Sequence, residues 1–177
     1  MNTFIRCAVL VYILSLAAWV HGQATTDLLN QACGPMGTRF AVHEGSPQPS
    51  LSAPPKTGAR IVVFVETIGL GAGCGFAPRV GLDSKWIGAT CAGSYISVDV
   101  DPGKHRLCAN AWWKNAAKYT ALYSFTAEPG NVYYFRAEMI QTAIPVISTV
   151  AMHLEPVNEE EGHLLLAARN SSESKVK

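Results

Sequence analysis

The sequence predicts an all-β fold, a single antiparallel β-sandwich of about seven to nine strands with a short C-terminal helix. Two stretches carry the main signal, Ser94 to Ala109 and Tyr123 to Glu138, in which apolar and polar residues alternate around an acidic-Pro-Gly sequence. Alternation with a period of two is typical of half-buried strands, and Pro-Gly favours a tight turn, so each stretch predicts a β-hairpin. A third stretch, Arg60 to Glu66, is almost continuously apolar and β-branched, which indicates a central strand covered on both faces.

Residues 1–22 are typical of a secretory signal peptide. Arg6 precedes an apolar run from Ala8 to Val20 that is too short to span a bilayer, and small residues suit cleavage after Gly22 or Ala24. No later apolar run approaches the length of a membrane span. We therefore expect an exported chain, periplasmic or extracellular, with no membrane span after cleavage.

The charge of the mature chain argues against one large class of partner. Cleavage removes one of the 14 Lys and Arg residues and none of the 13 Asp and Glu residues, which leaves the mature chain formally neutral. A neutral chain does not supply the basic surface that binding to a phosphate backbone requires, so we expect no nucleic-acid partner.

After the signal peptide the chain divides into three parts. Residues 23–59 form an N-terminal extension, in which Thr38 to His43 is a candidate edge strand and a linker rich in Pro and Ser follows. Residues 60–169 form the sandwich domain with its helix. Residues 170–177 are predicted to be a frayed polar tail.

Within the sandwich domain, shorter signals define the remaining elements. Arg79 to Leu82 and Lys85 to Ala89 are predicted strands around a tight turn, and Ile147 to Leu154 is predicted as the last strand. A helix is predicted from Glu159 to Arg169, because Asn158 is a good N-cap and three glutamates suit the positive end of a helix. Alternation predicts a core that contains Ile61, Val63, Val65, Ile96, Val98, Val100, Leu107, Phe125, Tyr133 and Phe135.

Four cysteines remain after the signal peptide, and an even number in an exported chain predicts two disulfides. Spacing alone leaves three connectivities open. If the strands form a meander, the loops at 67–77 and 90–93 lie at the same end of the sandwich, which favours a Cys74–Cys91 bond. The second bond then joins Cys33, before the first strand, to Cys108 in the middle of a strand.

Several turn and strand motifs resemble those of a known family. They are Cys33-Gly34-Pro35, the run from Arg79 to Asp83, Gly93-Ser94-Tyr95, the run from Pro102 to Ala109 and the run from Glu128 to Arg136. In these motifs the chain resembles a bacterial family of exported domains of unknown function (DUF2846-like), and the Pro-Gly-Lys-His segment is similar to the PEGA modules of surface proteins. The resemblance implies an immunoglobulin-like or PEGA-like β-sandwich at the cell envelope, and it brings no known active site.

Residues that could hold a cofactor or a metal do not fall into a working pattern. The glycine-rich run from Gly69 to Gly75 has no sixth-position glycine, no following helix and no lysine of the kind that nucleotide-binding loops need. The histidines of the mature chain lack the spacing of metal ligands; they are His43, His105, His153 and His163. We therefore expect no cofactor, no metal site and no catalytic residue.

The candidate binding surface is aromatic and comprises Trp112, Trp113 and Tyr119. Neighbouring residues of a strand face opposite ways, so at most one tryptophan can lie wholly in the core, and exposed aromatic residues are common anchors for proteins and sugars. The sequence therefore favours a non-enzymatic binding or structural module that contacts an envelope protein or a glycan. The alternative is a hydrolase of envelope or polysaccharide material, which a buried cleft joining His105 or His153 to a carboxylate would favour.

Overall fold

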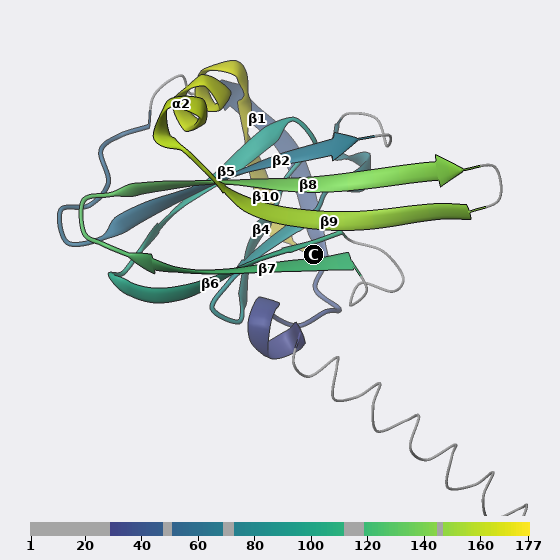
Figure 1. The fold of residues 1–177 in the computed structure, drawn as a ribbon, viewed down its shortest axis with the longest axis horizontal. Coiled ribbons are helices and arrows are strands. Elements are labelled where there is room, and N and C mark those ends of the chain that lie inside the picture. The colour runs from purple at the N-terminus through teal and green to yellow at the C-terminus, as the bar shows by residue number, and fades with distance from the viewer. Residues whose placement is uncertain (1–28, 48–50, 69–72, 112–118, 145–146) are drawn as a thin grey trace, which may run out of the picture.

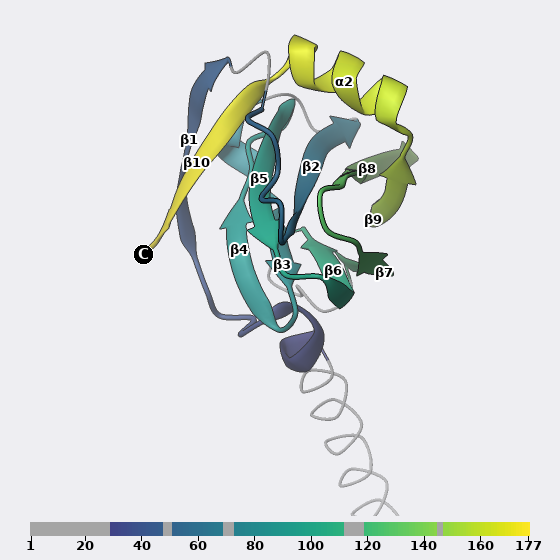
Figure 2. The ribbon, with the colours of Figure 1, turned by 90° about the vertical axis from the view of Figure 1, so that its left-hand side faces the viewer.

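Two β-sheets face each other across a shared core, and a short helix packs on the other side of the larger sheet (Figure 1, Figure 2). The computed structural model describes residues 29–47, 51–68, 73–111, 119–144 and 147–177. The predicted signal peptide, residues 1–22, lies outside the described residues. The predicted fold class, an all-β sandwich with a short C-terminal helix, is confirmed. The described residues contain ten strands, one more than the upper limit of the prediction.

The described strands are divided six to four between the two sheets. In spatial order the larger sheet contains β1 (Phe40–Pro47), β10 (Asn170–Val176), β5 (Ser94–Val100), β2 (Ala59–Ile68), β8 (Val132–Ile144) and β9 (Ile147–Val157). The smaller sheet contains β4 (Lys85–Ala89), β3 (Arg79–Leu82), β6 (Gly103–Asn110) and β7 (Thr120–Ala127). The described residues also contain three short helical elements: a helical stretch at residues 29–33, the 3₁₀ helix η1 (Cys74–Phe76) and α2 (Glu159–Ala168) between β9 and β10.

The two Pro-Gly stretches are not hairpins, so this prediction is wrong. β5 pairs with β2 and β10, whereas β6 pairs with β3 and β7, so residues 101–102 carry the chain from the larger sheet to the smaller one. Residues 128–131 carry it back from β7 to β8. The physical reason is burial: Ile96 and Val98 of β5 pack in the same core as Leu107 of β6, and strands meet face to face only when they belong to opposite sheets.

The sandwich is also not wholly antiparallel. β2 pairs in parallel with β8, and β10 pairs in parallel with β5. Each passage through a Pro-Gly turn changes the sheet, so β5 and β6, and likewise β7 and β8, belong to opposite sheets, whereas the consecutive strands β3–β4, β6–β7 and β8–β9 still pair with each other. The meander assumed from the sequence is therefore absent.

Residues 170–177 were predicted to be a frayed tail, but they contain the strand β10. β10 pairs antiparallel with the edge strand β1, from Asn170 opposite Pro47 to Val176 opposite Phe40. Its sequence of Ser, Glu and Lys has no apolar alternation, and backbone pairing on both sides holds it in the sheet. The predicted edge strand is confirmed as β1, which continues to Pro47 into the predicted linker.

The predicted core is confirmed. β2 is covered on both faces: Ile61, Val63 and Val65 face the shared core, whereas Val62 and Phe64 face α2. The ten predicted core residues all belong to the cluster between the sheets, some fully buried and others packed at its border. Burial on both faces explains why the β2 sequence shows no alternation.

The C-terminal helix is confirmed together with its cap. The side chain of Asn158 accepts a hydrogen bond from the backbone N–H of Glu161 at 2.9 Å, as an N-cap does. Leu166 is buried against Tyr134 of β8, and a Cβ atom at Gly162 would overlap the ring of Tyr134. The glycine that weakens the helix in the sequence therefore allows the helix to lie close to the sheet.

Candidate functional site

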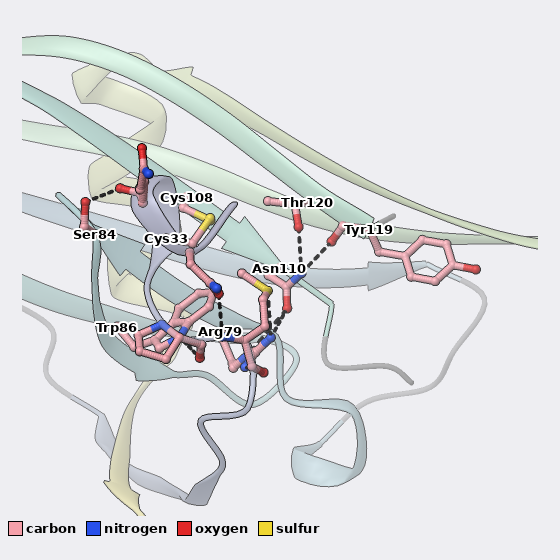
Figure 3. The surroundings of a disulfide bond; sticks show 12 residues. Cys33, Arg79, Ser84, Trp86, Cys108, Asn110, Tyr119 and Thr120 are labelled. Atoms are coloured by element: carbon pink, nitrogen blue, oxygen red, sulfur yellow. Dashed lines mark hydrogen bonds between the residues drawn. A yellow bond between two sulfur atoms is a disulfide. The ribbon is translucent and has the colours of Figure 1, made fainter. Parts of the chain in front are cut away.

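The N-terminal segment, residues 29–38, lies on the outer face of the smaller sheet and is bonded to it by a disulfide (Figure 3). Cys108 on β6 faces away from the shared core, because Leu107 and Ala109 on either side of it belong to that core. Its Cα atom lies 5.4 Å from that of Cys33, and both side chains are fully buried. The predicted Cys33–Cys108 pair is therefore confirmed.

A buried arginine holds the same segment. Arg79 at the start of β3 is 1% exposed. Its guanidinium donates hydrogen bonds to the backbone carbonyl oxygens of Met36 and Thr38 at 2.8 and 2.9 Å, and to Oδ1 of Asn110. It also lies 4.3 Å from the ring centre of Trp86, a cation–π distance. The acceptors around Arg79 thus come from the N-terminal segment and from β6 (Figure 3).

These partners of Arg79 are uncharged, and no carboxylate in the described part of the chain forms an ion pair with it. Burial lowers the pKa of Arg79 to about 10, because a low-dielectric surrounding disfavours the charged form. The side chain is still a cation at neutral pH, and its donors are used in holding the segment. We therefore assign Arg79 a structural role.

A groove opens beside this segment on the same outer face, and we name it the outer groove. It has a volume of about 580 Å³. Its walls come from the N-terminal segment and the β3–β4 turn, and its floor comes from β6 and β7. The lining residues are Gln31, Ala32, Asp83, Ser84, Lys104, His105, Arg106, Ser124, Phe125 and Thr126.

A histidine–carboxylate pair lies at the end of the outer groove, where Asp83 lines the wall and the ring of His105 lies on the inner side of β6 beside Phe125. His105 Nδ1 lies 2.6 Å from Oδ2 of Asp83, and Nε2 lies 2.7 Å from the backbone carbonyl oxygen of Asp101. Both neighbours are acceptors, so the ring satisfies both bonds only when both nitrogens carry protons. Burial alone would lower the pKa of His105, but the hydrogen bonds to Asp83 and Asp101 outweigh it and raise the pKa above its usual value. In its protonated form the ring therefore links the β3–β4 turn to the crossing at 101–102.

Both carboxylate oxygens of Asp83 have hydrogen-bond partners in this arrangement. Its Oδ2 faces His105, and its Oδ1 accepts a hydrogen bond from the backbone N–H of Arg106 at 2.9 Å. Asp83 and Ser84 both have positive φ angles, 48° and 69°, so the tight turn predicted at this position is confirmed. The hydroxyl of Ser84 donates to the carbonyl oxygen of Gln31, which closes the wall of the groove (Figure 3).

The second disulfide lies elsewhere, at the end of the glycine-rich loop. Cys74 in η1 is bonded to Cys91 with a Cα–Cα distance of 4.2 Å, so the predicted pair is confirmed. Cys91 is fully buried, whereas Cys74 is exposed. The backbone N–H of Ala92 donates to the carbonyl of Gly73 at 2.9 Å, which reinforces the attachment. Residues 69–72 of the loop lie outside the described residues.

A second polar cluster anchors α2 to the larger sheet. Arg136 of β8 forms ion pairs with four carboxylates, those of Glu66, Glu138, Glu155 and Glu161. Arg169, just after α2, pairs with Glu66 at 2.5 Å. Because Glu161 lies in the first turn of α2 and Arg169 follows its last turn, the cluster ties both ends of the helix to the sheet.

Of the three residues predicted to form an aromatic binding surface, Tyr119 is the one within the described residues. Trp112 and Trp113 lie outside them. Tyr119 is half-buried and packs at the border of the shared core, and its carbonyl oxygen accepts a hydrogen bond from the backbone N–H of Ala111 at 3.0 Å. The aromatic surface therefore stays a prediction.

The other histidines lie far apart in the fold. His43 is on β1, His153 is on β9 and the exposed His163 is on α2. No group of three or more His, Cys, Asp or Glu side chains that could hold a metal ion occurs in the part of the chain that the structure describes. None of the described helices is both long enough and apolar enough to cross a membrane.

Sequence reasoning missed Arg79, Asn110, Lys104 and Arg106. A charged residue at the start of a short strand gives no sign that the N-terminal segment will cover it. Lys104 and Arg106 left a weak signal, since they occupy alternate positions of a strand whose other face holds Leu107 and Ala109. No protein-family model matches the chain, and no curated protein matches it either.

Proposed function

We propose that this chain is an exported, non-enzymatic module of the cell envelope that binds another envelope component or stiffens an assembly. Two disulfides support export, because such bonds persist in oxidising compartments. The resemblance to exported domains of unknown function supports the same location. In this proposal residues 1–22 direct the chain out of the cell and are then removed.

One observation carries the non-enzymatic part of the proposal: the histidine of the outer groove has no nitrogen left for a substrate. A general base needs a ring nitrogen within reach of the proton that it removes. In His105 one nitrogen faces Asp83 and the other faces the carbonyl of Asp101. A histidine held between two acceptors is suited to joining loops.

The alternative function, hydrolysis of envelope polysaccharide, has one observation in its favour. The outer groove does join His105 to the carboxylate of Asp83, and a histidine–carboxylate pair in a groove is a feature of many hydrolases. Ser84 is the nearest hydroxyl in the sequence, but it donates to the carbonyl of Gln31. The pair therefore supports a structural role better than a catalytic one.

Export is tested with a reporter that is active only outside the cytoplasm. Residues 1–24 are fused to alkaline phosphatase lacking its own signal, and the matched control replaces Leu14 and Leu16 in the apolar run with glutamate. We expect phosphatase activity that the control loses. Equal activity of the two fusions, or activity in neither, would contradict export.

Binding and catalysis are tested on the mature chain in one comparison. The immobilised chain is incubated with envelope extract, alongside the variant with Trp112→Ala and Trp113→Ala, and captured proteins and glycans are identified. In parallel, release of soluble products from cell-wall material is measured for the wild type and for His105→Gln. Specific capture without product release supports the proposal. Product release that His105→Gln abolishes would establish the hydrolase instead.

A further inference from the structure

The floor of the outer groove presents cations and hydroxyl groups in two facing rows. Lys104 and Arg106 occupy alternate positions on the outer face of β6, so their Cα atoms are about 7 Å apart. In the antiparallel pairing with β7, Lys104 is opposite Thr126 and Arg106 is opposite Ser124. Side chains directly opposite each other on one face have Cβ atoms about 5 Å apart, so each cation has a hydroxyl beside it.

The free charge of the outer groove is positive. Among the described residues that line it, Asp83 is the only acidic one, and its two oxygens face the His105 ring and the backbone N–H of Arg106. Lys104 and Arg106 are exposed, and neither forms an ion pair with a side chain in the described ranges of the chain. Two cations are therefore available to a ligand, at a site where both oxygens of the carboxylate already have hydrogen-bond partners.

Resting on the proposed function, we propose that the outer groove is a binding site for an acidic polysaccharide, with Arg106 and Lys104 contacting successive carboxylate groups. A guanidinium binds a carboxylate through two parallel hydrogen bonds, and an ammonium supplies three donors. Ser124 and Thr126 offer donors and acceptors that match the hydroxyl groups of a sugar. The groove thus provides cations for the carboxylate of a uronic acid unit and hydroxyl groups for its hydroxyls.

The composition of the groove favours a glycan over a protein. Interfaces between proteins are centred on buried aromatic and apolar anchors. The aromatic residue that lines the outer groove, Phe125, turns inward, where it packs with Phe135 and Tyr133 in the shared core. On the outer face of β7, the row of Ser124 and Thr126 continues to Leu122, which is 48% exposed and supplies one small apolar surface. The groove floor itself is charged and hydroxylated.

The test uses the mature chain and three probes at low ionic strength. A galacturonic acid hexasaccharide is titrated by calorimetry, a neutral glucose hexasaccharide is the uncharged control, and vesicles of phosphatidylglycerol represent an anionic lipid surface. We expect the acidic hexasaccharide to bind, the neutral one not to bind, and added salt to weaken the binding by screening. The variant with Lys104→Gln and Arg106→Gln should bind at least about tenfold more weakly, since two charge-assisted contacts are lost.

The matched control removes two charges elsewhere, through Lys56→Gln and Lys175→Gln, both exposed positions outside the outer groove. Its affinity for the acidic hexasaccharide should equal that of the wild type. The proposal is overturned if the wild type does not bind, if the control variant loses as much affinity as the groove variant, or if the vesicles bind and the hexasaccharide does not. Melting temperatures of both variants identify any unfolding, and none is expected because all four side chains are exposed.

The same titration separates this inference from the proposed function. If new reducing ends appear in the hexasaccharide and binding still requires Lys104 and Arg106, the non-enzymatic role is contradicted. The same result supports the outer groove as the binding site. If the groove variant captures an envelope protein and the wild type does not bind the hexasaccharide, the proposed function is supported. The same result overturns the proposal that the outer groove binds an acidic polysaccharide.

Discussion

The backbone N–H of Cys91 donates a hydrogen bond to the side-chain oxygen of Ser172 on β10, at 3.0 Å. Two residues earlier, the N–H of Ala89 donates to Ser174 in the same way, at 3.2 Å. β4 is an edge of the smaller sheet, and the edge of a sheet presents N–H groups that have no partner strand. Serines at alternate positions of β10 accept hydrogen bonds from N–H groups along this side of the smaller sheet, and they thereby join the two sheets.

We predict that Ser172→Ala combined with Ser174→Ala lowers the free energy of unfolding by about 1 to 3 kcal/mol, because two N–H groups lose their acceptors. Amide hydrogen exchange at Ala89 and Cys91 should become faster. The matched control is Ser171→Ala, whose hydroxyl donates to the carbonyl of Ser46 on β1. Unchanged exchange at both amides would mean that the serines do not protect the β4 edge.

Loss of the two disulfides should have unequal effects. Cys33 and Cys108 are 75 residues apart and Cys74 and Cys91 are 17 apart, which in the chain-entropy model corresponds to about 4 and about 3 kcal/mol. Cys108→Ser also places a hydroxyl in a fully buried cluster, whereas Cys74 is exposed. We therefore expect Cys108→Ser to lower the thermal midpoint more than Cys74→Ser. The measurement is thermal unfolding with free thiols blocked, and the reverse order would contradict the argument.

The His105 bridge should stabilise the fold most at low pH. Its pKa is raised in the folded chain, so its stabilisation is fully present below the ordinary histidine pKa of about 6.5 and is lost as the pH rises through the folded-state pKa. His105→Gln should cost about 1 to 3 kcal/mol at about pH 5.5 and much less at about pH 9. The groups that face the ring are the carboxylates of Asp83 and Asp101 and the carbonyl oxygen of Asp101.

The control for this pH dependence is His163→Gln. His163 is 62% exposed on α2 and pairs only with the exposed Glu159 at 3.7 Å among the ion pairs of the described residues. Its replacement should change the unfolding free energy little at either pH. A constant His105→Gln effect across the pH range, measured by urea denaturation, would show that the imidazolium is not the stabilising form.

Removal of the acceptor of Arg79 should be costly. Asn110 Oδ1 accepts from Nε of Arg79 at 3.2 Å and also from Nη2, and the Asn110 side-chain amide donates to Thr120 at 2.7 Å. Asn110→Ala leaves a buried cation short of acceptors, so we expect a loss of about 3 kcal/mol in urea denaturation. Asn131→Ala, at an exposed turn position, is the matched control and should cost less than about 1 kcal/mol. Equal losses would contradict the role of Asn110.

The sequence alone predicted the strand content and the core, because these depend on local patterns, and it predicted both disulfides from the expected placement of the loops. Alternation identified Ile96, Val98 and Leu107 as inward-facing, and their burial does not depend on which sheet holds each strand. The Cys74–Cys91 bond followed from the two loops lying at one end, which holds in the observed topology although the meander does not. The helix cap at Asn158 is likewise a local signal.

The tertiary structure decided which strands pair and what the outer face of the smaller sheet became. A Pro-Gly turn is compatible with a hairpin and with a crossing between sheets, and only packing of β5 against β6 across the core selects the crossing. Likewise, nothing local marks residues 170–176 as a strand or Arg79 as buried, because both depend on partners more than 30 residues away. Hydrophobic alternation records which face of a strand is covered, whereas strand partners and polar sites arise from long-range contacts that leave no periodic trace in the sequence.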